Sequence, residues 1–91
     1  MNNYMVVAKF KNEATQADIK ELIPAEMAQA KILEDKGLLG EIRVSMPKRT
    51  VFLEAIGQNE YEVSSMINTL PLASLWDFEI FQTTPPAGQA S

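Results

Sequence analysis

The sequence predicts an α+β fold, in which two helices cover a four-stranded antiparallel sheet. Four segments rich in β-branched and aromatic residues are typical of strands. Two segments between them carry apolar residues at helical spacing, and turn or capping residues separate the elements. Their order is β-α-β-β-α-β, and the 91 residues are enough for one small domain.

The first strand is expected at Tyr4–Lys11, followed by a connector and a long helix. The tetrapeptide Thr15-Gln16-Ala17-Asp18 resembles a capping box with Asp in place of Glu, so the helix should start near Gln16. Gly37 suits the C-terminal cap, and Pro24 is expected to kink or divide the helix. The apolar stripe of this helix consists of Ile19, Ile23, Ala30 and Leu33.

A hairpin is expected next, because Leu39–Ser45 and Thr50–Ile56 flank the turn Met46-Pro47-Lys48-Arg49. Asn59 is a good N-cap for the second helix, which is expected to run to about Leu70. The apolar stripe of the second helix consists of Val63, Met66, Ile67 and Leu70.

The last strand is expected at Trp76–Gln82, which completes a ferredoxin-like domain over residues 1–82. The remaining residues, 83–91, form a tail that contains two prolines. Such a tail is either a disordered end or an arm that lies on a neighbouring subunit.

Side chains alternate between the two faces of a sheet, so the hairpin predicts one apolar and one polar face. The apolar face, expected under the helices, consists of Ile42, Val44, Val51, Leu53 and Ala55. The polar face has three expected cross-strand pairs: Ser45 with Thr50, Arg43 with Phe52, and Glu41 with Glu54.

The first and last strands add both apolar and charged side chains to this polar face, namely Met5, Val7, Lys9, Asp77, Glu79 and Phe81. A solvated face seldom exposes so many large apolar groups, and a buried core seldom holds so many charges. A sheet-to-sheet homodimer interface explains both, and a solvated face is the alternative.

Two groups of carboxylates are candidates for chemistry. Glu41 opposite Glu54 places like charges across a strand pair, with Arg43 as a diagonal neighbour. This pair is either an exposed, Arg-balanced cluster or a site where one carboxyl group has a raised pKa.

Glu26 lies on the apolar stripe of the first helix, where burial would raise its pKa toward values useful for proton transfer. Alternatively, Pro24 restarts the helix and Glu26 is an early-turn residue stabilised by the helix dipole.

Composition excludes several classes of chemistry. The chain has no Cys and no His, which removes disulfides, thiolate sites and the commonest general base and metal ligand. Its net charge is −4 and its basic residues are scattered, so no nucleic-acid partner is expected. No apolar run is long enough for a membrane span or a signal peptide, and a cytoplasmic location is expected. No metal or cofactor motif appears.

The chain resembles the muconolactone isomerase family, within the dimeric α+β barrel superfamily. The resemblance is best over residues 37–80, and its most specific part is Leu70-Pro71-Leu72 followed by Asp77-Phe78-Glu79-Ile80. The segment Glu26–Gly37 also fits, with Glu26 at a family carboxylate position.

This resemblance implies a protomer that pairs through its sheet and a cofactor-free isomerisation of a small unsaturated lactone carboxylate. It implies that Glu26 shuttles the proton and that Arg43 or Lys48 holds the substrate. Glu41, Glu54 and Trp76 are further candidate substrate-binding residues, with Trp76 at the mouth of a pocket or in the core.

Two other functions stay open. One is a cofactor-independent monooxygenase or cyclase of the same superfamily, acting on an aromatic or polyketide substrate. The other is a non-catalytic binding or assembly module, in which the polar sheet face is only an interface.

Overall fold

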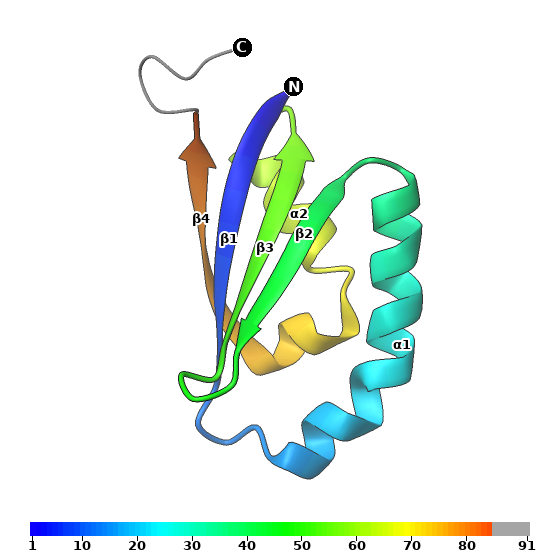
Figure 1. The fold of residues 1–91 in the computed structure, drawn as a ribbon, viewed down its shortest axis with the longest axis vertical. Coiled ribbons are helices and arrows are strands. Elements are labelled where there is room, and N and C mark those ends of the chain that lie inside the picture. The colour runs from blue at the N-terminus through cyan, green and yellow to red at the C-terminus, as the bar shows by residue number, and fades with distance from the viewer. Residues whose placement is uncertain (85–91) are drawn as a thin grey trace.

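A computed structural model describes residues 1–84 and has the predicted α+β architecture (Figure 1). Its elements are β1 (Asn2–Phe10), α1 (Gln16–Asp35), β2 (Leu39–Ser45), β3 (Thr50–Gly57), α2 (Glu60–Ile67), the 3-10 helix η1 (Pro71–Leu75) and β4 (Trp76–Thr83). The β-α-β-β-α-β order is therefore confirmed, with η1 inserted before β4. Of the predicted tail, Thr83 ends β4, and residues 85–91 lie outside the described residues.

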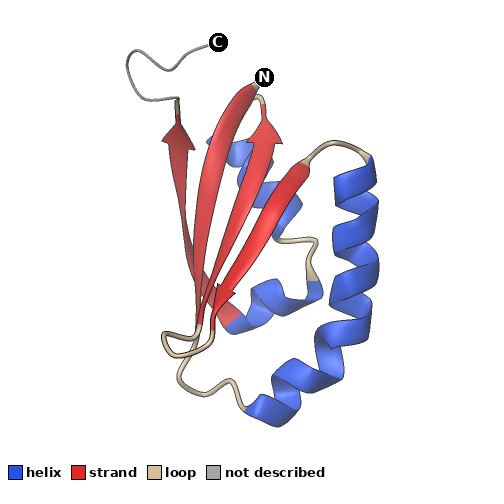
Figure 2. Ribbon diagram, viewed as in Figure 1, coloured by secondary structure: helices blue, strands red, loops and turns tan. Residues whose placement is uncertain are grey.

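The four strands form one antiparallel sheet in the order β2-β3-β1-β4, so β2 and β4 are its edges. The helices lie on one face of this sheet, and none of residues 1–84 covers the other (Figure 2). We call the uncovered side the open face. The core lies between the sheet and the helices, and its largest fully buried side chains are Val6, Leu53, Val63, Ile67 and Leu70.

Local signals set both ends of α1. The hydroxyl of Thr15 accepts from the N–H of Asp18, whose carboxylate accepts from the N–H of Thr15, both at 3.1 Å. This pair is the predicted capping box. Gly37 has φ +75°, as its expected capping role requires. Pro24 does not divide the helix, because α1 is continuous from Gln16 to Asp35, but the ribbon bends in its first half (Figure 1).

The second helix is shorter than predicted. Asn59 caps it as expected, with its Oδ1 accepting from the N–H of Glu62 at 2.8 Å. However, α2 ends at Ile67 rather than near Leu70. The reason is Pro71, which has no N–H to donate and disfavours helical backbone at the preceding Leu70. The chain then turns into η1, an element that the sequence analysis did not predict.

Two expectations for the hairpin are wrong. Leu39 pairs with Ala55 while Ile42 pairs with Leu53, so a bulge at residues 40 and 41 removes the direct Glu41–Glu54 pair. The N–H of Glu41 instead donates to the carboxylate of Glu54 at 3.0 Å. Val44 was expected under the helices but is 56 % exposed, because it lies near the end of an edge strand that α1 contacts only sparsely.

Candidate functional site

The structure divides the predicted site residues between the two faces of the sheet. Glu26 and Trp76 belong to the helix-covered side, whereas Arg43 and Glu54 project from the open face. The four cannot line one pocket within a single chain, because the sheet separates them. We therefore describe two sites, beginning with the helix-covered side.

Glu26 links α1 to η1. Its Oε1 accepts from the backbone N–H of Leu72 at 2.9 Å, and this is its only hydrogen bond with residues 1–84. Leu72 provides the first free N–H of η1, since Pro71 before it has none. The carboxylate of Glu26, which belongs to α1, thus caps the first turn of η1. No early-turn role applies, because Glu26 lies in the middle of the continuous α1.

The surroundings of Glu26 raise its pKa above the ordinary value of 4.5. The cause is burial, which removes water from the charged form, and the hydrogen bond from Leu72 opposes it in part. The side chain is half-buried rather than enclosed. Glu26 is therefore a carboxyl group with shifted acidity and one oxygen without a protein donor among residues 1–84.

Trp76 lies in the core and not at a pocket mouth. It is 4 % exposed, and its ring meets that of Phe10 edge-to-face with centroids 6.1 Å apart. Its indole N–H is buried and has no acceptor among residues 1–84. A buried donor without a partner costs about 1–3 kcal/mol, so this N–H lowers the stability of the fold.

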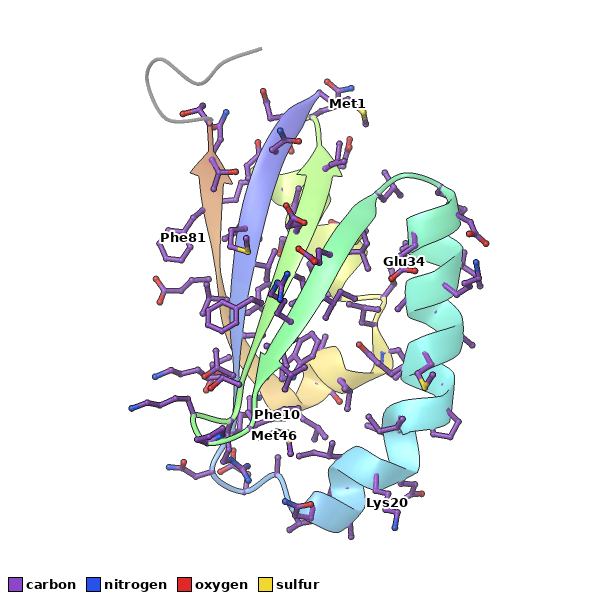
Figure 3. The ribbon with its side chains drawn as sticks, viewed as in Figure 1. Met1, Phe10, Lys20, Glu34, Met46 and Phe81 are labelled. Carbon is purple, nitrogen blue, oxygen red and sulfur yellow. The ribbon has the colours of Figure 1, made fainter. Side chains whose placement is uncertain are left out.

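An apolar groove lies between the start of α1 and the β2–β3 turn. Its volume is about 90 Å³, and it is lined by Phe10, Gln16, Ile19, Val44, Ser45, Met46 and Arg49. Figure 3 shows Phe10 and Met46 at this end of the molecule. Glu26 follows Ile19 by seven residues on the same helix, which is about 10 Å along its axis. The groove and Glu26 thus lie along one side of α1.

Arg49 borders this groove, and the sequence reasoning did not select it. Its guanidinium donates to the carbonyls of Lys11 and Ala14 at 3.1 and 2.8 Å and lies 5.9 Å from the Phe10 ring centroid. It makes no ion pair with residues 1–84. Its φ of +48° is unusual for a residue other than glycine. This backbone angle marks Arg49 as a candidate functional residue, and only a structure shows it.

On the open face, three predicted residues do come together. Glu41, Arg43 and Glu54 line a hollow of about 130 Å³ with Met5 and Phe52. Arg43 forms an ion pair with Glu41 at 2.8 Å, and both side chains are mostly exposed. The carboxylate of Glu54 accepts a hydrogen bond from the N–H of Glu41, and Arg43 balances the charge of Glu41. The cluster therefore corresponds to the exposed, Arg-balanced alternative.

Lys48 lies apart from both sites, in the exposed β2–β3 turn, where its carbonyl accepts from the hydroxyl of Thr50. A larger hollow, of about 530 Å³, borders Lys9, Lys11, Glu13, Asp77 and Glu79 near the ends of β1 and β4 but contains none of the predicted residues.

Within residues 1–84 there is no group of three or more residues able to hold a metal ion. Over the same range, no helix has the length and apolarity needed to cross a bilayer.

Comparison with known proteins adds no assignment. No family model matches the chain, and no curated protein matches it.

Proposed function

We propose that the protein is a cofactor-free isomerase that moves a double bond in a small lactone or carbonyl acid. The observation that carries this proposal is Glu26, a half-buried carboxyl group whose pKa is raised by burial. Proton transfer is most efficient when the pKa of the catalytic group lies near the operating pH, and burial shifts the pKa of Glu26 in that direction. The chain has no His or Cys that could serve instead.

The reaction needs only one group to carry the proton. Glu26 takes a proton from one carbon of the substrate, the electron pair shifts across the double bond, and the same carboxyl group returns the proton at another carbon. Atoms and charge balance without a co-reactant. The bond from Leu72 fixes Oε1 and leaves the other oxygen for this transfer.

The groove beside α1 supports binding of a small acid on the same side of the sheet. Ile19 and Val44 offer apolar contacts, and Arg49 offers a cation for a carboxylate. Arg49 takes the role that the resemblance gave to Arg43 or Lys48, since Arg43 projects from the open face and Lys48 does not line the groove.

We also propose that the protein acts as a homodimer formed through the open face. Phe52 and Phe81 project from this face with 37 % and 49 % of their surfaces exposed, and Figure 3 shows Phe81 at its edge. Met5 and Val7 lie between them on the central strand β1. An apolar band of this kind, flanked by charges, is typical of an interface with a polar rim.

The test is the ultraviolet change when muconolactone is mixed with the wild type, with Glu26→Gln and with the matched control Glu34→Gln. Glu34 is an exposed acid of the same helix, so its variant should keep full turnover. Turnover in the wild type that falls at least about 100-fold in Glu26→Gln would support the proposal. Equal turnover in both variants would remove Glu26 from the mechanism, and no turnover in any would exclude this substrate.

A non-catalytic assembly module is the second candidate. The bond between Glu26 and Leu72 favours it, because that bond already gives the carboxylate a structural task. In that case Glu26→Gln would change stability and not any activity.

A further inference from the structure

The open face carries a row of side chains that is complementary to itself. The strand registers place Arg43 beside Phe52, Phe52 beside Val7, and Val7 beside Glu79. The row crosses all four strands in the order β2-β3-β1-β4, so its ends lie on the two edge strands. It therefore has a positive end, an apolar middle and a negative end.

When the strands of two stacked sheets stay nearly aligned, a two-fold axis in the plane between them runs either along the strands or across them. An axis parallel to the strands places β2 of one copy over β4 of the other, so that each row lies over its own equivalent with the ends exchanged. An axis perpendicular to the strands places each strand over its own equivalent, running in the opposite direction. The side chains of the row distinguish the two arrangements.

With the axis parallel to the strands, opposite charges meet. Arg43 faces Glu79 of the partner subunit, and symmetry forms this pair twice. In the middle of the row Phe52 faces Val7 of the partner subunit. In the neighbouring row, where Met5 pairs with Glu54 and Phe81, Glu54 faces Met5 of the partner subunit, so no acidic group opposes another.

With the axis perpendicular to the strands, the contacts are poorer. Centred on this row, it places Arg43 over Arg43 of the partner subunit and Glu79 over Glu79 of the partner subunit. Shifted by half a row, it brings Arg43 to Glu41 of the partner subunit, but it also lays Phe52 over a Glu54 carboxylate. Like charges and a carboxylate under an aromatic ring both oppose association.

The side chains at both charged ends of the row are exposed. The side chain of Arg43 is 74 % exposed, and its only ion pair with residues 1–84 is to Glu41 of its own chain. Glu79 makes no ion pair with residues 1–84. Stacked sheets lie about 10 Å apart, a gap that an extended arginine and a glutamate bridge together.

We propose that the homodimer has its two-fold axis parallel to the strands and is fixed in register by two ion pairs between Arg43 and Glu79 of the partner subunit. This inference rests on the proposed homodimer. The partner is a second copy of this chain because the same face supplies both ends of each pair. Ion pairs at the rim of an interface set its register and specificity more than its affinity.

The first test is a charge swap, followed by sedimentation equilibrium of the full chain. Arg43→Glu and Glu79→Arg should each weaken the dimer by about 10-fold or more, because each creates two like-charged contacts. The double variant should return the dissociation constant to within about 3-fold of the wild type. Asp77→Lys is the matched control, since Asp77 faces uncharged Ser45 in this arrangement and should have little effect.

A second test measures the geometry directly, because the chain has no natural cysteine. A short bismaleimide reagent that spans about 8 Å should join Arg43→Cys to Glu79→Cys in a mixture of the two variants. Each chain in this mixture carries a single cysteine, so any crosslink between the two positions joins two chains.

Each result is decisive. Failure of the double variant to recover dimerisation, or crosslinking of Arg43→Cys to itself as fast as to Glu79→Cys, would overturn the parallel axis and leave the homodimer standing. A wild type that sediments as a monomer at micromolar concentration would overturn both, without bearing on turnover at Glu26.

Discussion

Glu26→Ala tests whether the contact between α1 and η1 contributes to the stability of the fold. The substitution removes the acceptor of the 2.9 Å bond from Leu72 and leaves that N–H without a protein partner. An N–H left without a partner costs about 1–3 kcal/mol, and removal of the buried carboxylate, whose desolvation outweighs the Leu72 bond in its effect on the pKa of Glu26, offsets part of this cost. We expect a net loss of about 1–2 kcal/mol, which is a fall of about 5–15 °C in Tm for a domain of this size.

Thermal and urea unfolding, followed by circular dichroism at pH 7, measure this loss. Met27→Ala is the control, because Met27 is the next residue of α1 and is 66 % exposed, so its truncation should cost less than about 0.5 kcal/mol. Glu26→Gln retains an acceptor oxygen and should lose less than Glu26→Ala. Equal stability of Glu26→Ala and Met27→Ala would refute the view that Glu26 holds η1 to α1.

Two further predictions concern pH and packing. Because the pKa of Glu26 in the folded state is raised above 4.5, its titration favours the folded state at low pH, and this contribution is lost as pH rises through the folded pKa. The stability of Glu26→Gln relative to the wild type should therefore increase between pH 4 and pH 7 in urea unfolding, and a decrease would contradict the shift. Gly57→Ala should lose about 1–3 kcal/mol, because a Cβ there would lie 2.8 Å from Cγ2 of Val63. Gly40→Ala, whose Cβ would meet Glu54 at 3.2 Å, should lose less in the same assay, and equal losses would contradict the clash.

Signals confined to a few neighbouring residues predicted most of the fold. The capping box at Thr15, the cap at Asn59 and the glycine at position 37 each act through the adjacent backbone, and all three are present in the structure. The alternation of apolar and polar residues likewise predicted which side chains of β1 and β4 face the helices. Such patterns depend only on strand geometry.

Errors arose where distant segments interact. The bulge at residues 40 and 41 depends on how the carboxylate of Glu54 meets the N–H of Glu41 across the hairpin. Likewise, the exposure of Val44 depends on how little of α1 packs against the edge strand β2. Neither of these contacts between separate segments can be predicted from the spacing of residues along one strand.

The candidate site shows the same division. The sequence alone indicated that Glu26 lies on an apolar stripe and that its chemistry would involve a carboxylate, because no His or Cys is available. It could not show that the acceptor atom of Glu26 meets the N–H of Leu72, 46 positions later. The alternation along the hairpin already predicted that Arg43 lies on the face away from the helices, and only the family resemblance joined Arg43 with Glu26 in one site. Composition determines which groups exist, whereas their distances and exposure to water follow from tertiary packing.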